Sequence, residues 1–132
     1  MRAALWPHEA AEEHAAEIDR FFAGDAHMLQ LVLIATDGAD TPVGFAELSI
    51  RPYADGCESD QVAYLEGWYV DPEFRRAGVG GELVAAAERW ARDLGLTEFA
   101  SDALLDNEIS ASAHRALGFE EVERIRCFRK AL

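Results

Sequence analysis

A glycine-rich turn with two arginines is the first feature of the chain that could bind a ligand. Arg75 and Arg76 precede Gly78, Gly80 and Gly81, between a strand-like run and an amphipathic helix. Glycine lets the backbone approach a ligand closely, and the first N–H groups of a helix attract anions. The turn has neither the full dinucleotide fingerprint nor the Gly-Lys-Ser/Thr of a P-loop. We therefore predict a phosphate site formed by Arg75, Arg76, Ala77, Gly78, Val79, Gly80 and Gly81.

A carboxylate in the middle of a predicted core strand is the second candidate. Alternation places Tyr64, Glu66 and Trp68 on one face of the strand from Val62 to Val70. A buried carboxylate is costly unless another group satisfies it. A cationic amine substrate would do so, with the two rings as cation–π walls. The alternative is a hydrogen bond from neighbouring backbone or from an arginine.

A second carboxylate, Asp102, ends the strand predicted over Thr97–Asp102. Because strand, helix and strand follow one another, we expect this strand to lie parallel to Val62–Val70. Parallel strands bind ligands at their carboxyl ends, so Asp102 could lie close to Glu66 across a cleft. Two carboxylates there would hold ammonium groups, and one could accept the proton of an attacking amine. Asp102 could instead be a capping or turn residue.

These residues need a scaffold that brings the turn and the carboxylates together. The predicted helices are Pro7–Ala23, Val79–Leu94 and Asn107–Leu117. The predicted strands are Met28–Ala35, Val43–Arg51, Val62–Val70, Thr97–Asp102 and Phe119–Lys130. The first two strands should form an antiparallel hairpin. We expect one α/β domain, of the α+β type, over residues 1–132.

Composition limits the classes of function. The chain has 132 residues, of which 50% are hydrophobic, and this suffices for one domain with a core. A formal net charge of −13 argues against nucleic acid or an anionic membrane as a partner. It suits a cationic substrate, although an acidic solvated surface explains it equally well. We expect a cytoplasmic protein without metal, because no signal peptide or apolar span is visible and Cys57 and Cys127 fit no metal spacing.

Two separate motifs, in the expected order, resemble those of the GCN5-related N-acetyltransferases. The six residues from Arg75 fit (Gln/Arg)-x-x-Gly-x-(Gly/Ala), which cradles the pyrophosphate of coenzyme A in that superfamily. Asn107–Phe119 is similar to its Asn-x-x-Ala-x-x-Leu-Tyr-x-Lys-x-Gly-Phe segment. More closely, the chain looks like the aminoglycoside 6′-N-acetyltransferases, from about Ala4 to the C-terminus. This likeness is carried by Tyr64–Gly67, Phe99–Asp102, Leu105–Asn107 and His114–Glu120.

The resemblance implies the fold of that superfamily. Its sheet is mixed and mostly antiparallel, and acetyl-coenzyme A lies along a splayed parallel pair, here Val62–Val70 and Thr97–Asp102. The first strand of the family fold, which would precede Leu5-Trp6-Pro7, is expected to be missing. Related enzymes are commonly dimers, so the resemblance also implies a homodimer.

The resemblance also implies roles for individual residues. Backbone N–H groups from Trp68, Tyr69 and Val70 would polarise the thioester carbonyl. Asn107 would contact the cosubstrate or cap its helix. His114 could protonate the leaving thiolate or be packed locally. The substrate-side residues would be Trp6, Tyr53, Glu66, Asp102 and Glu123, although Trp6 could be core, Tyr53 loop and Glu123 surface.

Together these patterns predict an enzyme that acetylates the 6′-amino group of aminoglycosides and so confers resistance. Transfer would be direct, within a ternary complex of enzyme, acetyl-coenzyme A and drug. Two alternatives remain open. One is an acetyltransferase of the same superfamily that acts on a polyamine or a peptide amine, and the other is a weakly catalytic coenzyme A-binding domain.

Overall fold

Four strands form one mixed sheet in the computed structural model, which describes residues 1–25 and 29–132. The strands are β1 (Leu29–Thr36), β2 (Pro42–Arg51), β3 (Val62–Val70) and β4 (Phe99–Ser101), in that spatial order. β1, β2 and β3 are antiparallel neighbours, and β4 runs parallel to β3. The mixed sheet and its parallel pair confirm the expected fold class. β4 is shorter than predicted, and Met28 lies outside the described residues.

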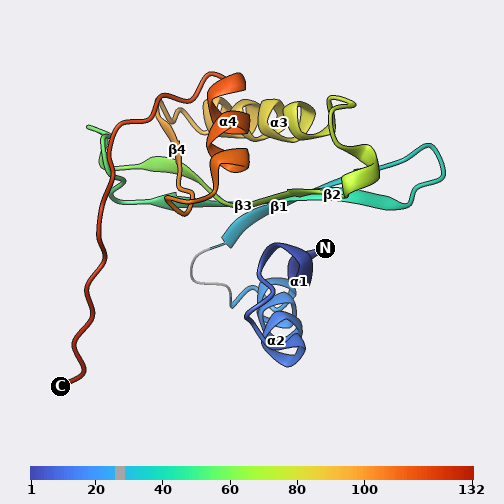
Figure 1. The fold of residues 1–132 in the computed structure, drawn as a ribbon, viewed down its shortest axis with the longest axis horizontal. Coiled ribbons are helices and arrows are strands. Elements are labelled where there is room, and N and C mark those ends of the chain that lie inside the picture. Colours follow the sequence, from blue (N-terminus) through green and yellow to red (C-terminus); the bar gives the residue numbers. More distant parts are fainter. Residues whose placement is uncertain (26–28) are drawn as a thin grey trace.

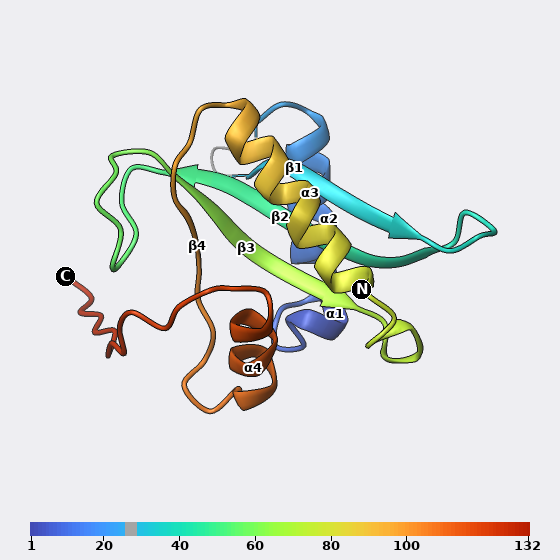
Figure 2. The same cartoon turned by 90° about the horizontal axis from the view of Figure 1, so that it is seen from above.

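Helices cover both faces of this sheet (Figure 1). α3 (Val79–Asp93) and α4 (Glu108–Ala116) lie over one face, and α1 (Arg2–Leu5) and α2 (Ala11–Phe22) lie over the other. A short 3-10 turn, η1 (Pro72–Phe74), connects β3 to the glycine-rich turn. Figure 2 shows α3 lying over the sheet roughly along β3, with α4 beside the end of β4.

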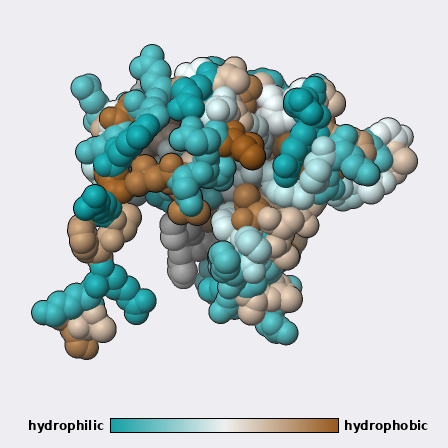
Figure 3. Space-filling model, in the orientation of Figure 1, coloured by the Kyte–Doolittle hydropathy of each residue, from teal (hydrophilic) through white to brown (hydrophobic). Residues whose placement is uncertain are grey.

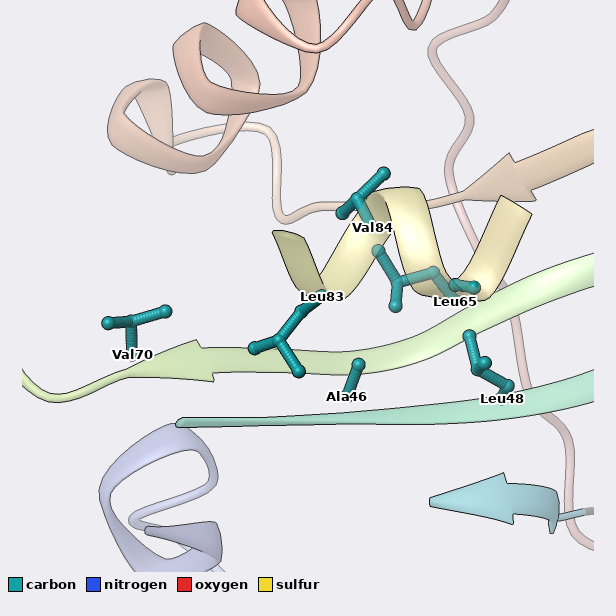
Figure 4. Close-up of a cluster of buried hydrophobic side chains, with 7 residues drawn as sticks. Ala46, Leu48, Leu65, Val70, Leu83 and Val84 are labelled. Atoms are coloured by element: carbon teal, nitrogen blue, oxygen red, sulfur yellow. The ribbon is translucent and has the colours of Figure 1, made fainter. Parts of the chain in front are cut away.

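The main core lies between α3 and the sheet. Leu83 points from α3 towards the strands β2 and β3, as Figure 4 shows, and Val84 belongs to the same buried cluster. The buried residues of α3 recur at helical spacing, so one stripe of the helix leaves water and stabilises the layer by burial. These residues are Leu83, Val84, Ala87 and Ala91. α3 ends at Asp93, one residue before the predicted end.

The N-terminal helix differs from its prediction. The helix expected from Pro7 begins instead at Ala11, and an unpredicted helical turn, α1, precedes it. Pro7 lies in the turn between them, because proline removes a backbone donor and disfavours helix in the residue before it. At the new start, the Glu13 carboxylate accepts a hydrogen bond from the Ala10 N–H at 3.2 Å.

The strand predicted over Phe119–Lys130 is wrong in this structure. Residues 119–132, here called the C-terminal segment, contain no helix or strand and extend away from the sheet (Figure 1). Apolar side chains remain on its surface, and brown atoms mark them on the protruding part in Figure 3. The larger apolar residues of the segment recur every three positions rather than every two, which does not suit a strand, and the β4 edge does not pair with the segment here.

A β-bulge in β3 also breaks the predicted alternation. Leu48 pairs with Leu65 and Glu47 pairs with Gly67, so Glu66 is an extra residue without a partner on β2. Tyr64 therefore lies on the face away from α3, whereas Trp68 packs against the core beneath α3. The expectation that Trp68 shares a face with Tyr64 and Glu66 is wrong, because the extra residue reverses the side-chain alternation, whereas Tyr64 and Glu66 both contact Arg51.

Candidate active site

The glycine-rich turn creates an open helix N-terminus. Gly78 adopts a left-handed conformation, with φ of 90°, immediately before α3. The first bond recorded inside the helix runs from the Glu82 N–H to the Gly78 carbonyl at 3.0 Å. The N–H groups of residues 79–81 therefore have no acceptor within the helix and, with the helix dipole, favour an anion. The structure thus provides the helix start that the pattern predicted.

Glycine is required in this turn by close packing as well as by conformation. A Cβ on Gly80 would lie 2.7 Å from the Trp68 indole, whereas one on Gly81 would lie 3.5 Å from Leu117, the residue that follows α4. The turn is therefore held between β3 and α4. The Trp68 Nε1 atom is buried there without a hydrogen-bond acceptor.

The two arginines of the turn lie at the surface. Arg75 Nε donates to the Val70 carbonyl at 2.9 Å, and its guanidinium lies 5.7 Å from the Tyr69 ring centre. Arg76 is exposed and has a φ of 61°. Arg75 thus stabilises the end of β3 through its Nε atom.

β3 and β4 separate beside this turn. Their parallel pairing runs only from Ala63 and Phe99 to Leu65 and Ser101. Within the described part of the chain, residues 66–70 therefore have no partner on the β4 side. This is the splayed pair that was predicted, and it leaves one edge of β3 open at Trp68, Tyr69 and Val70.

His114 of α4 connects the two strands. Its Nδ1 lies 2.8 Å from the Ser110 carbonyl oxygen, and its Nε2 lies 3.0 Å from Ser101 Oγ. Because a carbonyl only accepts, Nδ1 carries a proton. The Ser101 hydroxyl oxygen, which lies beside His114 Nε2, also donates to the Leu65 carbonyl at 3.2 Å. The ring also meets Trp68 edge-on, with centroids 5.6 Å apart.

Glu66 is satisfied by an arginine, which is the alternative that the sequence left open. Arg51 Nε and Nη2 donate to its two oxygens at 2.8 and 2.5 Å, and Ser49 Oγ donates at 2.5 Å. These hydrogen bonds are the main cause of the raised pKa of Arg51. The energetic cost of placing this carboxylate within a strand is therefore offset by a bidentate ion pair with Arg51.

Tyr64 connects this pair to Asp102. The Tyr64 hydroxyl donates to Asp102 Oδ2 at 2.7 Å, while the Arg51 guanidinium lies 3.5 Å over the Tyr64 ring. Burial first, and then Asp102, raise the pKa of Tyr64 well above its ordinary value, so the phenol stays protonated. Glu66 and Asp102 are thus joined through Arg51 and Tyr64 rather than by direct contact.

A cavity of about 780 Å³ opens at the β4 edge of the sheet. Residues 52–60, β4, α4 and the C-terminal segment surround it. Carboxylates dominate its charge, and those lining it include Asp55, Asp102, Glu108, Glu120 and Glu123. The glycine-rich turn and Glu66 do not line it, so the predicted residues fall into two groups joined by β3 and α4.

The remaining predicted residues lie at different distances from this cavity. The Trp6 ring covers Gly67, next to Glu66, and packs 6.2 Å from Phe45. Tyr53 donates to Asp55 at 2.7 Å. Asn107 caps α4 by accepting the Ser110 N–H at 3.0 Å, as one of its two predicted roles requires.

Sequence reasoning missed Arg51, Ser49 and Ser101. A signal for the first two was present, because Glu47, Ser49 and Arg51 alternate with apolar residues along β2. This is the pattern of a strand with one polar face. Ser101 had no comparable signal, since its role depends on the position of α4.

Comparison with known proteins defines the class. The sequence profile described as "Acetyltransferase (GNAT) family" matches residues 1–119. This chain belongs to that family. Among the described residues, no helix is long and apolar enough to cross a membrane, and no group of three or more His, Cys, Asp or Glu could hold a metal ion.

Individual relatives are similar along the whole chain. An aminoglycoside N(6′)-acetyltransferase type 1 of Klebsiella aerogenes is 56% identical over 132 residues, which cover 100% of this chain and 87% of the relative. AAC(6′)-Iy in complex with a bisubstrate analog, CoA-S-monomethyl-acetylneamine, matches with a TM-score of 0.90 and 41% identity, over 100% of this chain and 88% of that one. The 6′-N-acetyltransferase AAC(6′)-IG of Acinetobacter haemolyticus matches with a TM-score of 0.90 and 40% identity, over 99% and 88%.

Proposed function

We propose that this protein transfers the acetyl group of acetyl-coenzyme A to the 6′-amino group of aminoglycoside antibiotics and so confers resistance to them. The observation that carries the proposal is the carboxylate-lined cavity, in a chain 56% identical throughout to an enzyme named for this reaction. Aminoglycosides are cationic amino sugars, and the net charge of −13 favours their approach.

The helix N-terminus is the proposed site for the pyrophosphate of acetyl-coenzyme A. Amides of residues 77–81 would donate to it, aided by Arg75 and Arg76. The fit has local support, because the cradle accepts no side chain at Gly80 and the buried Trp68 Nε1 lacks an acceptor. Asn107 would contact the cosubstrate only with the part of its amide that does not cap α4.

The drug would bind on the cavity side. Asp102 and Glu123 line the cavity and would hold its ammonium groups. Tyr53, which lies beside Asp55, and Trp6, which covers Gly67, would contact the sugar rings. Glu66 is the remaining carboxylate of this group, and its ion pair with Arg51 is considered in the next subsection.

The chemical step requires a neutral amine. Asp102 or Glu66 would accept the amine proton, directly or through water. The amine lone pair then attacks the thioester carbonyl, so that a C–N bond forms, the C–S bond breaks and the thiolate leaves. Backbone N–H groups of the open β3 edge at Trp68–Val70 would hydrogen-bond the carbonyl oxygen as it gains charge.

His114 would assist departure of the thiolate. Both of its ring nitrogens are bonded within the protein, so the Ser101 hydroxyl would have to leave Nε2 or relay the proton. A thiolate leaves tolerably well without help. Loss of His114 should therefore slow turnover rather than abolish it.

We further propose a homodimer in the cytoplasm. Support for the dimer comes from the C-terminal segment, where Phe128 is 91% exposed and Val122 is 63% exposed, because a second copy would cover these side chains. Both cysteines are free thiols, in keeping with a reducing compartment.

The test is product analysis. The protein is incubated with acetyl-coenzyme A and kanamycin, thiol release is followed, and the product is examined by mass spectrometry and NMR. We expect one added acetyl group, on the 6′-nitrogen. If spermidine or a peptide from a panel is acetylated as fast as kanamycin or faster, the substrate is that amine and not an aminoglycoside. Coenzyme A binding without thiol release would identify a binding domain instead.

A further inference from the structure

Among the described residues, Arg51 is the side chain that forms an ion pair with Glu66, and it also lines the cavity. Arg51 lines the cavity, whereas Glu66 does not. The Arg51 side chain is 31% exposed and that of Glu66 is 17% exposed, so the guanidinium lies on the solvent side of the pair. A cation that enters the cavity therefore meets Arg51 before it can reach Glu66.

The contacts of Arg51 are those expected for a bound cationic ligand. It donates to both Glu66 oxygens, and its guanidinium lies 3.5 Å over the face of Tyr64. A carboxylate on one side and an aromatic ring on the other is also the environment that suits a substrate ammonium group. Both groups belong to the protein, so the arginine occupies this position without an association cost.

Other arginines at the cavity differ in this respect. Arg92 pairs with Glu88 one helical turn away on α3, and its side chain is 68% exposed. Arg115 and Arg124 pair with Glu121 near the mouth. In the described part of the chain, Arg51 is the only arginine recorded both against an aromatic ring and against a proposed catalytic carboxylate.

We infer that Arg51 is a specificity-determining residue that occupies, in the free enzyme, the place of a substrate ammonium group on Glu66. A substrate amine must displace this guanidinium before Glu66 can bind it or take its proton. Arg51 therefore weakens binding of every amine by the strength of the internal pair, and it favours substrates with enough positive charge to compete. This inference rests on the proposed function and concerns the substrate side of the same site.

The experiment compares three variants with the wild type for kanamycin acetylation, at low and at high salt. Arg51→Gln should lower the KM for kanamycin at least threefold and leave kcat within about twofold. Arg51→Lys keeps the charge but not the bidentate geometry, so it should lower the KM for kanamycin by a smaller factor. Arg92→Gln is the matched control, because it removes the same charge from the same cavity, and its KM should stay within twofold.

A double-mutant cycle isolates the role of Glu66. Binding of kanamycin is measured by calorimetry for Arg51→Gln, Glu66→Gln and the double variant. The gain from Arg51→Gln should vanish in the Glu66→Gln background. If the gain persists, Arg51 acts only by general repulsion and the inference is wrong.

Other outcomes also decide between roles. A fall in kcat with unchanged or raised KM in Arg51→Gln would make Arg51 a positioning residue for Glu66 and overturn the inference. If Arg51→Gln does not fold, Arg51→Lys carries the test, and an unchanged KM there is the overturning result. Absence of kanamycin turnover by the wild type would overturn the proposed function itself, so the two failures are distinguishable.

Discussion

Asp102 is held in place by Tyr64, which stays protonated and so cannot itself accept the proton of an amine. Tyr64 donates a hydrogen bond to one Asp102 oxygen, and its raised pKa keeps the donor protonated near neutral pH. Asp102 itself is exposed and faces the cavity. One carboxylate oxygen is thus fixed while the other stays open to an amine, an arrangement that suits both binding and proton acceptance.

Substitution of Asp102 should therefore impair the reaction. We expect Asp102→Asn to lower kcat/KM for kanamycin at least tenfold, a loss of about 1.4 kcal/mol or more of transition-state stabilisation. Asp106→Asn is the matched control, since Asp106 is an exposed aspartate in the same connection that does not line the cavity. If thiol release shows the same kcat/KM for Asp102→Asn as for Asp106→Asn and the wild type, Asp102 has no role in the mechanism.

For single residues, the sequence indicated which side chains could do chemistry better than it indicated which partners surround them. Glu66 and Asp102 could be singled out because charged residues in or after apolar strands are unusual. Their partners could not be assigned, because Arg51 reaches Glu66 from a strand that is 15 residues away in sequence. Such pairings depend on strand register, which periodicity alone leaves open.

The start of α3 shows how a single element can depend on one contact. Gly80 lies directly against Trp68, whereas Gly81 has ordinary clearance from Leu117. Neither glycine has a positive φ. The difference between them is therefore steric, and it can be measured.

Alanine substitutions should separate these two positions. Gly80→Ala would force Trp68 aside and should lower the free energy of unfolding by about 1–3 kcal/mol. It should also weaken acetyl-coenzyme A binding. Gly81→Ala should leave stability unchanged or raise it by up to about 1 kcal/mol, because alanine favours helix. Urea unfolding of both variants provides the comparison, and equal stabilities would contradict the packing argument.

A charged cluster attaches α1 to the sheet on the other face. Arg2 contacts Glu17 of α2 at 2.5 Å and Glu47 of β2 at 3.0 Å. The Glu47 side chain is only 5% exposed, and burial raises its pKa despite the nearby Arg2 charge. Folded protein therefore retains the Glu47 proton to higher pH than the unfolded chain does.

This difference predicts a pH dependence of stability. As pH rises from about 4.5, the ordinary pKa of glutamate, the unfolded chain loses the proton first, so the free energy of unfolding falls until Glu47 ionises in the folded state. In Glu47→Gln there is no carboxyl group at this position, so this fall in the free energy of unfolding does not occur. We expect its stability relative to wild type to improve as pH increases from about 4.5 to about 8 in urea unfolding experiments.

Asp37→Asn is the control of opposite sign. Backbone N–H groups of Thr41 and Ala39 lower the pKa of Asp37 below 3.8. The stabilisation that this carboxylate provides is present above that value and is lost only as pH falls through it. Its stability difference from wild type should therefore stay constant over the same pH range. A constant difference for Glu47→Gln as well would contradict the assignment to Glu47.

Most elements were predictable because each has its own local signal. The β3 bounds and the α3 start agree with the sequence expectation, since apolar periodicity and the glycine turn lie within those segments. α1 was not predicted, because four residues hold too little periodicity to detect. The bulge at Glu66 was missed although Gly67 follows it directly, and a glycine inside a strand often marks a bulge.

At the scale of the whole molecule, the C-terminal segment stands out because several of its apolar side chains are exposed and its backbone pairs with no strand. Its larger apolar residues, Phe119, Val122, Ile125 and Phe128, recur every three positions rather than every two, and the fold of one chain leaves Phe128 91% and Ile125 50% accessible. The sequence analysis predicted a strand here, and one chain forms none, because apolar residues alone do not supply a sheet edge with which the segment could pair.

The proposed homodimer predicts a specific sensitivity. Phe128→Asp should shift the protein from dimer to monomer in light scattering, because a buried unpaired charge at an interface is strongly unfavourable. Phe22→Asp is the matched control, since Phe22 is 81% exposed on α2 and should leave the mass unchanged. A wild-type monomer at all concentrations, or a dimer that survives Phe128→Asp, would argue against this interface.

The extra residue at Glu66 has a consequence for how such an enzyme can diversify. Before it, Tyr64 faces away from α3 and lines the cavity proposed for the amine, and beyond it Trp68 packs beneath α3 beside the proposed cradle for the acyl donor. One strand thus carries two independent surfaces, separated by an irregularity of a single position. Drug preference can change through mutations upstream of this point while the donor cradle keeps its shape, which gives resistance a short adaptive path to new antibiotics.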